Sequence, residues 1–181
     1  QLLSERPTMT ETRKKPAPKE TSPYWEQFAR FENDPKQLAW VLPLRRAGIS
    51  RFAELGFPTL EDEDWRFTNV APIAKLPFKP VLDYSGDGVT AESLGQLTFA
   101  ALEGPRLVFV NGHYAQELSS VPPQMDGIKV SSLAAALMSD SGLIEKNLAR
   151  HARTDDNAFA ALNTAFFQDG AFIHVPAGKS L

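Results

Sequence analysis

Hydrophobic residues recur at helical spacing in the first third of the chain. Aromatic side chains come three positions apart in 23–31, where Ser22 and Pro23 supply an N-cap and a proline at the first helical position. Residues 36–42 repeat this pattern and predict a second helix. Pro43 ends or kinks that helix, because proline lacks a backbone donor, and it can begin a third helix whose apolar stripe runs up to a glycine.

The middle of the chain changes from helical periodicity to short apolar runs. Prolines and glycines interrupt 76–90, which is typical of a loop with one or two short strands. In 106–118 two apolar runs flank Asn111 and Gly112, a pair that tolerates the positive φ angles of a type I′ turn. We therefore predict a β-hairpin there and a further short strand at 127–130.

Three helices and a strand are predicted for the last third. A serine can cap the helix predicted at 132–140, and 142–152 follows as a second helix. The helix predicted at 155–169 begins with two aspartates, which the positive end of the helix dipole stabilises. Residues 171–175 alternate as in a half-buried strand. One face of the last helix gathers Phe159, Leu162 and Phe166.

These elements predict an α+β fold in three parts. Residues 1–21 are rich in Pro, Lys, Thr and Glu and carry few apolar anchors, so we expect a disordered tail. Residues 22–169 form a helical region with the β-hairpin. Residues 170–181 form a strand and a turn. We expect this strand to lack a partner that completes its ladder, and therefore to aggregate or stay partly disordered.

Composition limits the classes of function. The 181 residues are 43% hydrophobic and 23% charged with a net charge of -3, so the chain can bury a core but lacks the basic footprint of nucleic-acid binding. It has no run of the roughly 18–20 apolar residues that a membrane span needs and no charged-then-apolar leader, so we expect a cytoplasmic protein without a membrane partner. The absence of cysteine excludes disulfides, thiolate nucleophiles and cysteine-ligated clusters within this stretch.

The acidic stretch LEDEDWRF, residues 60–67, is the first candidate site. As a calcium loop it would place Arg66 at the fifth ligand position and Phe67 at the required glycine, which excludes calcium. Neighbouring acids on a helix point about 100° apart, so they do not form an acid/base pair across a substrate. Thr59 and Asp62 instead match a capping box, and we predict that a helix begins here.

Two other patterns imitate ligand sites. PAGKS, residues 176–180, matches the end of a phosphate-binding loop, but Ile173 stands where the first glycine is required, so we predict a turn. The three histidines lie far apart without a second histidine at helical spacing, and we predict structural roles for them. We assign no residue a catalytic, cofactor-binding or metal-binding role. The histidines are His113, His151 and His174.

Three stretches, taken in order, resemble one family. The stretches are GFPTLEDEDWRFTNVAPI (56–73), RLVFVNGHYAQELSS (106–120) and NAFAALNTAFFQDGAFIHVPAGKSL (157–181). They are similar to the N-terminal part of SufD, in the SufB/SufD family of iron–sulfur cluster assembly proteins. The resemblance extends from about residue 23 to the end, and the Pro-Thr to Trp-Arg-Phe-Thr signature favours SufD over SufB.

The resemblance implies a helical N-terminal region that leads into a right-handed parallel β-helix, cut off at the C-terminus of this chain. It implies a non-enzymatic subunit of a SufB–SufC–SufD complex, with a SufB-type scaffold and a SufC-type ATPase as partners whose contacts lie mostly beyond Leu181. The iron–sulfur cluster is then handled by the complex, and this segment binds no cofactor. Trp65, Arg66 and Phe67 would be structural, with the aromatics against the hairpin or the β-helix and the arginine paired with an acid.

Two hypotheses from other classes stay open. A carbohydrate-active enzyme on a parallel β-helix would need clustered carboxylates or a calcium site on one face, and usually export. A free-standing helical adaptor would need no further domain. Co-purification with SufB-type and SufC-type proteins would distinguish both from an assembly subunit.

Overall fold

The computed structural model describes residues 23–34, 37–76, 78–86, 88–97, 104–122 and 125–180, so the tail predicted at 1–21 lies outside the described residues. The helices, strands and two short 3-10 helices (η) follow in chain order. They are α1 Pro23–Glu32, α2 Leu42–Leu55, η1 Glu63–Trp65, α3 Ala71–Ala74, α4 Ala91–Leu97, β1 Phe109–Val110, β2 His113–Tyr114, η2 Gln116–Leu118, β3 Lys129–Ser132, α5 Leu133–Ser139, α6 Ser141–Asn147, α7 Ala158–Phe166 and β4 Ala171–His174.

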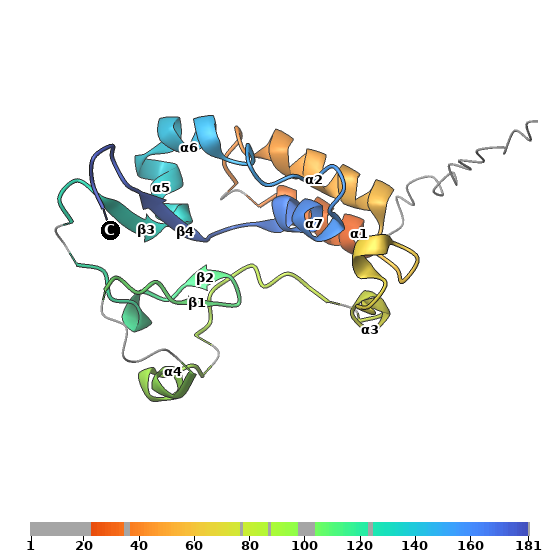
Figure 1. Cartoon of the computed structure of the whole chain (residues 1–181), viewed down its shortest axis with the longest axis horizontal. Coiled ribbons are helices and arrows are strands. Elements are labelled where there is room, and N and C mark those ends of the chain that lie inside the picture. The colour runs from red at the N-terminus through yellow and green to blue at the C-terminus, as the bar shows by residue number, and fades with distance from the viewer. Residues whose placement is uncertain are drawn as a thin grey trace, which may run out of the picture.

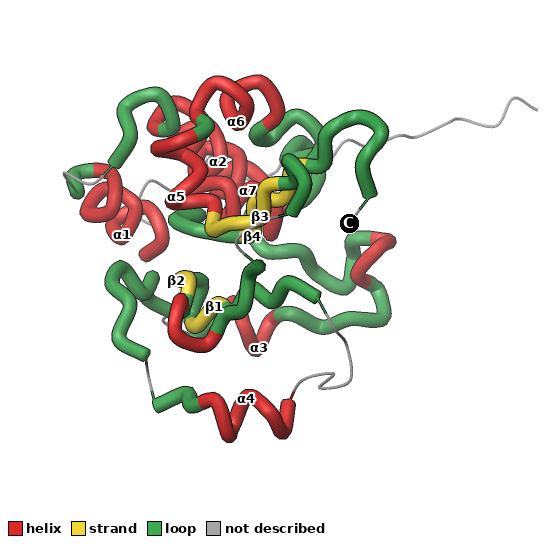
Figure 2. The backbone as a smooth tube through the Cα atoms, turned by 90° about the vertical axis from the view of Figure 1, so that its left-hand side faces the viewer, coloured by secondary structure: helices red, strands yellow, loops and turns green. Residues whose placement is uncertain are grey.

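Most helices form one layer above the hairpin. Helices α1, α2, α5, α6 and α7 lie together, the β1–β2 hairpin lies beneath them, and α4 is on the far side of the hairpin (Figure 1). Figure 2 shows the same order after a quarter turn. Two small antiparallel sheets, β1–β2 and β3–β4, complete the described structure. This mixture confirms the predicted α+β class.

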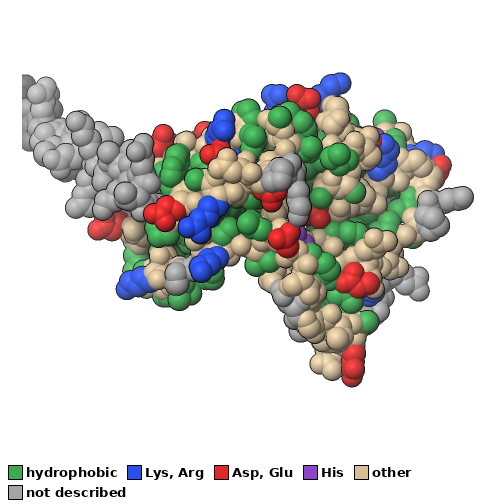
Figure 3. Space-filling view, turned by 180° about the vertical axis from the view of Figure 1, so that it is seen from behind, with side chains coloured by type: hydrophobic (Ala, Val, Ile, Leu, Met, Phe, Trp, Pro, Cys, Tyr) green, Lys and Arg blue, Asp and Glu red, His purple; other side chains and the backbone are tan. Residues whose placement is uncertain are grey.

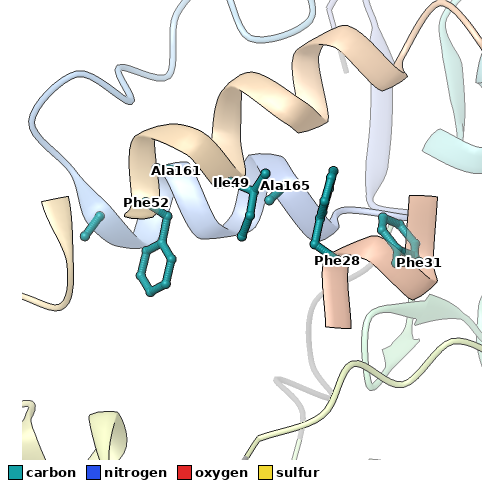
Figure 4. Close-up of a cluster of buried hydrophobic side chains, with 7 residues drawn as sticks. Phe28, Phe31, Ile49, Phe52, Ala161 and Ala165 are labelled. Atoms are coloured by element: carbon teal, nitrogen blue, oxygen red, sulfur yellow. The ribbon is translucent and has the colours of Figure 1, made fainter. Parts of the chain in front are cut away.

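The main core lies where α2 packs on α7, with α1 closing one side (Figure 4). Phe31, Ile49 and Ala161 are almost fully buried there. Gly48 of α2 lies so close to α7 that a Cβ at this position would be 2.8 Å from both the Ala161 carbonyl oxygen and the Ala165 nitrogen. Only a residue without a side chain allows this approach, so the crossing depends on glycine.

A second core joins α5 and α6 to the chain that precedes α2. Val41, Leu137 and Ile144 are buried together, and the aromatic rings of Phe167 and Phe172 pack against them. Because Phe172 belongs to β4, this core also fixes the last strand on the helical layer.

The strand β4 pairs antiparallel with β3, with Lys129 opposite His174. The expectation that this strand has no partner is therefore wrong, because β3 satisfies one of its edges. The alternation predicted for 171–175 is present: Phe172 faces the second core, whereas Ile173 is 53% exposed.

The predicted hairpin is confirmed. Asn111 has φ 50° and Gly112 has φ 85°, and these two residues join β1 to β2. Both residues adopt positive φ as a type I′ turn requires, which asparagine and glycine tolerate. Leu94 of α4 packs against the small apolar core of this hairpin.

Caps define helix boundaries in three places, and those at Ser132 and Gly56 were predicted. Ser132 Oγ accepts a hydrogen bond from the Ala135 amide at 3.1 Å and starts α5. Asn157 Oδ1 accepts a hydrogen bond from the Ala160 amide at 2.9 Å and starts α7. The cap is therefore the asparagine that follows the two aspartates at the predicted start of this helix. Gly56, with φ 64°, ends α2.

Three predicted helices differ from the structure. The helix predicted at 155–169 spans only Ala158–Phe166, because Asn157 caps its start and Phe167 leaves the helical conformation. Residues 37–41 form turns, and the helix begins at Leu42 because Pro43 fits the first turn, where no backbone donor is needed. The helix predicted at 142–152 ends at Asn147, since Leu148 is extended and Ala149 has φ 56°.

Candidate functional site

Residues 167–169, between α7 and β4, connect three parts of the molecule. The carboxylate of Asp169 accepts hydrogen bonds from the amide of Ala134 at 2.9 Å, in the first turn of α5, and from the amide of Tyr114 at 3.2 Å, in β2. The Gly170 amide donates a third, at 2.8 Å. Asp169 therefore holds the hairpin against the helical layer.

Arg45 of α2 is a buried cation at the same junction, with 5% of its surface exposed. Its Nη2 donates to the Phe167 carbonyl oxygen at 2.8 Å, and its guanidinium lies 4.9 Å from the Phe31 ring centre and 4.8 Å from that of Phe167. Burial lowers the pKa of Arg45 to about 10, so the side chain stays charged at neutral pH. Its Nε and Nη1 have no hydrogen-bond partner among the described residues, and the two rings supply cation–π attraction.

Gln168 and His113 hold the extended segment that precedes α4. Gln168 Nε2 donates to the Val81 carbonyl oxygen at 3.0 Å, and His113 Nε2 lies 2.7 Å from the same oxygen. A carbonyl only accepts, so His113 carries its proton on Nε2 in this contact. This contact links β2 to the segment that contains Val81, as expected for a histidine with a structural role.

These contacts border a pocket of about 330 Å³ between the helical layer and the hairpin. Acids outnumber cations in its described lining, which holds Arg45 together with Asp34, Asp83 and Asp169. An anionic ligand is therefore disfavoured. The described lining holds no serine, threonine, cysteine or lysine, and its titratable side chains other than Arg45 are Asp34, Asp83, Tyr84, His113 and Asp169. The pocket therefore lies between the helical layer and the hairpin, which Asp169 joins through its hydrogen bonds.

The acidic stretch lies on the surface with all four carboxylates exposed. Asp62 Oδ2 accepts from the Thr59 amide at 2.7 Å, which confirms the acidic half of the predicted capping box. Thr59 Oγ1 accepts from the Glu61 amide at 3.2 Å instead of the third helical amide, because the chain closes into the short turn η1 rather than an α-helix. Within the described part of the chain, no three His, Cys, Asp or Glu side chains lie close enough to hold a metal ion.

The partners predicted for Trp65, Arg66 and Phe67 are wrong. Trp65 is partly buried and lies against Phe159 of α7, with ring centres 5.3 Å apart. Phe67 is 88% exposed, and the Arg66 guanidinium lies 4.8 Å from its ring centre rather than beside a carboxylate. The tight turn at η1 brings only the tryptophan to α7.

The remaining candidates have structural surroundings. PAGKS forms the predicted turn, in which Gly178 has φ 79° and Lys179 Nζ lies 2.6 Å from Asp126 Oδ2. His174 is partly buried in β4, and its Nδ1 has no partner among the described residues. His151 is exposed beyond the end of α6 and does not terminate it.

Three junction residues were not predicted from the sequence: Arg45, Gln168 and Asp169. The sequence pattern predicts the last two at the end of a helix, and an arginine in an amphipathic helix is typical of a solvent-facing position. The polar pair Gln168–Asp169, between an apolar helix and an apolar strand, is the sequence signal that could have indicated the junction.

No helix in the described residues is both long and apolar enough to cross a membrane.

Comparison with known proteins identifies the family of the chain. A family model described as the SufBD protein N-terminal region matches residues 19–181. The chain belongs to the SufBD family. This confirms the family that the three resembling stretches indicated.

Relatives from a plant and a cyanobacterium match over most of the chain. Iron-sulfur cluster assembly SufBD family protein ABCI9 of Arabidopsis thaliana is 29% identical over 158 residues, 78% of this chain and 33% of the relative. The SufBD family protein slr0076 of Synechocystis is 29% identical over 148 residues, 76% of this chain and 29% of the relative. The chain thus spans about a third of the length of these relatives.

Proposed function

We propose that this chain is the N-terminal region of a SufD-type subunit that supports iron–sulfur cluster assembly without catalysing a reaction itself. The match of the SufBD N-terminal family over 19–181 carries this proposal. The relatives named for cluster assembly support it. The signature from Pro58 and Thr59 to Thr68 favours the SufD type.

The iron–sulfur cluster is cargo of the complex in this proposal and not a cofactor of the chain. Clusters are held by several thiolate or imidazole ligands. The chain has no cysteine, and its described residues bring no three His, Asp or Glu side chains together. These residues do not fit a cluster, so the role of this region is to position other parts of the assembly.

The junction at 167–169 suggests how it does so. Asp169 and Arg45 brace the connector between α7 and β4, which sets the direction in which β4 leaves the helical layer. The side chains of Ile173 in β4 and of Val175 just after it are exposed. In this proposal a parallel β-helix packs on that face, and the SufB-type scaffold and SufC-type ATPase bind mainly to the β-helix part, in the cytoplasm.

Co-purification tests the proposal. The tagged full-length protein is co-expressed with the SufB-type and SufC-type proteins of the same source, in parallel with a tagged chain that stops at Leu181. We expect the full-length protein to retain both partners and the shorter chain to lose the ATPase. Retention of neither partner by the full-length protein would contradict the proposal, and polysaccharide binding would then be tested.

A further inference from the structure

Exposed hydrophobic side chains concentrate in one part of the described chain. Of the eleven large hydrophobic residues that are strongly exposed, eight lie between Leu60 and Val89. Phe67, Leu76 and Phe78 have more than half of their surfaces exposed. Single exposed hydrophobic residues are normal, whereas a contiguous patch of them marks an interaction site.

One of these residues, Phe78, lines a groove of about 320 Å³ between α1, residues 78–80 and α7. Gln27 Nε2 of α1 donates to the Phe78 carbonyl oxygen at 2.8 Å and so fixes residues 78–80 as one wall. The opposite wall is the face of α7 that carries Leu162, and Lys79 is the one charged residue in the described lining. This volume is near the lower end of ligand pockets, roughly 300–1,000 Å³, and suits one or two apolar side chains.

The segment beside the groove is basic, although the chain as a whole is acidic. Residues 65–82 contain Arg66, Lys75 and Lys79 and no acidic residue. Among the described residues none of these cations pairs with a carboxylate; Arg66 lies over the Phe67 ring. Figure 3 shows basic, acidic and hydrophobic side chains mixed at the end of the molecule where α3 lies.

The shape and the number of charges favour a protein ligand over a membrane or a nucleic acid. Lipid recognition typically uses clusters of about four to eight basic residues, and α3, with four residues, is too short to lie in a bilayer surface. The exposed acids at 61–64 would repel a continuous polyanion. A protein segment can place single carboxylates against single cations and one apolar side chain in a groove.

We propose that Arg66, Phe67, Lys75, Phe78 and Lys79, together with the adjoining groove, form a docking face for an acidic segment of a protein partner, which inserts an apolar side chain beside Leu162. This docking face is a property of the N-terminal region itself. It holds whether or not the protein also joins the assembly complex proposed above.

Two synthetic helical peptides of equal length test the charge preference. Both carry the same leucine and phenylalanine face, one with glutamate and the other with lysine on its polar face, and each is titrated into the full-length protein by fluorescence anisotropy. We expect the glutamate peptide to bind at least about tenfold more tightly, with an affinity that falls as salt rises. Equal affinity of the two peptides would overturn the proposal.

Variants locate the binding. Lys75→Glu with Lys79→Glu should remove the preference for the glutamate peptide, and Phe78→Ser should weaken both peptides. The matched control, Lys146→Glu with Arg150→Glu, reverses two exposed cations on and after α6 and should change neither affinity. Circular dichroism checks that each variant is folded. Loss of binding in the control as well would contradict a defined docking face.

Three further results would overturn the proposal in favour of another occupant. The first is binding to phosphatidylserine vesicles that depends on Lys75 and Lys79 while the peptides fail to bind. The second is a dimer, seen by sedimentation, that the Lys75→Glu and Lys79→Glu changes dissociate. The third is a Phe67→Cys variant of the full-length protein that resists maleimide labelling when native but reacts in urea, because another part of the same protein then covers this position.

Discussion

The α2–α7 crossing and the segment 66–80 use hydrophobic residues in different ways. In the two helices these residues recur at helical spacing, so each helix turns one stripe toward the other and buries it. In 66–80, prolines confine α3 to four residues, no continuous face forms, and Phe67 stays in solvent. Hydrophobic content alone therefore does not decide burial here: in the second region Val70 is buried, whereas Phe67 and Leu76 are exposed.

Two phenylalanines give the largest expected contrast. Phe28→Ala removes a ring that is 3% exposed and packs edge-on against Phe166, so we expect a loss of about 3–5 kcal/mol in the free energy of unfolding. Phe67→Ala removes a solvent-exposed ring and should change the free energy of unfolding by less than about 0.5 kcal/mol. Urea denaturation measures both. Similar losses for the two variants would contradict the comparison.

Two helical glycines test the close approach of α2 and α7. Gly48→Ala forces a methyl group against the α7 backbone, so we expect a loss of about 1–3 kcal/mol even though alanine favours a helix. Gly142→Ala on α6 meets open space and should gain up to about 1 kcal/mol from helix propensity. Thermal melts of the two variants should therefore shift in opposite directions, and a stabilised Gly48→Ala would show that the helices are not in contact.

Trp65 lies at the border between the two regions. Because it is partly buried against Phe159, Trp65→Ala should cost about 1–3 kcal/mol, less than the loss at Phe28. A double-mutant cycle with Phe159→Ala should return a coupling of roughly 0.5–1.5 kcal/mol for the ring pair. A coupling of zero would mean that the tryptophan does not pack on α7.

The smallest expected effect is a pH dependence at Asp140. Hydrogen bonds from Lys129 and Ser139 hold the pKa of Asp140 below its usual 3.8. A carboxylate whose pKa is depressed by folding stabilises the folded state above its unfolded pKa and loses this contribution as the pH falls through the lower folded value. The urea midpoints of the native protein and of Asp140→Asn should therefore converge as the pH falls from about 5 to about 2. Parallel curves would contradict this.

Local elements were predictable where one short signal decides them. Asn111 and Gly112 specify the hairpin, Ser132 begins α5, and Pro43 lies in the first turn of α2. At Thr59 only one of the two predicted capping hydrogen bonds forms, the one from the Thr59 amide to Asp62. The other fails because the choice between an α-helix and a 3-10 turn also depends on the residues beyond the turn.

The junction could not be predicted, because its contacts join residues that are remote in sequence. Arg45 and Phe167 are 122 positions apart, and Asp169 and Tyr114 are 55 apart. Sequence spacing states which side chains share a helix face, but not which distant backbone group a carboxylate or guanidinium meets. The β-helix, which rests on the family resemblance, stays a prediction.

Hydrogen exchange tests the contrast between the two regions most directly. Amides of α2 and α7 should exchange slowest, since they open only when the main core opens, and those of 71–76 should exchange roughly a hundredfold faster or more. This result would establish a self-sufficient helical core beside a face that is free for a partner. Protection of 71–76 equal to that of α2 would contradict the contrast, because that segment would then already be buried.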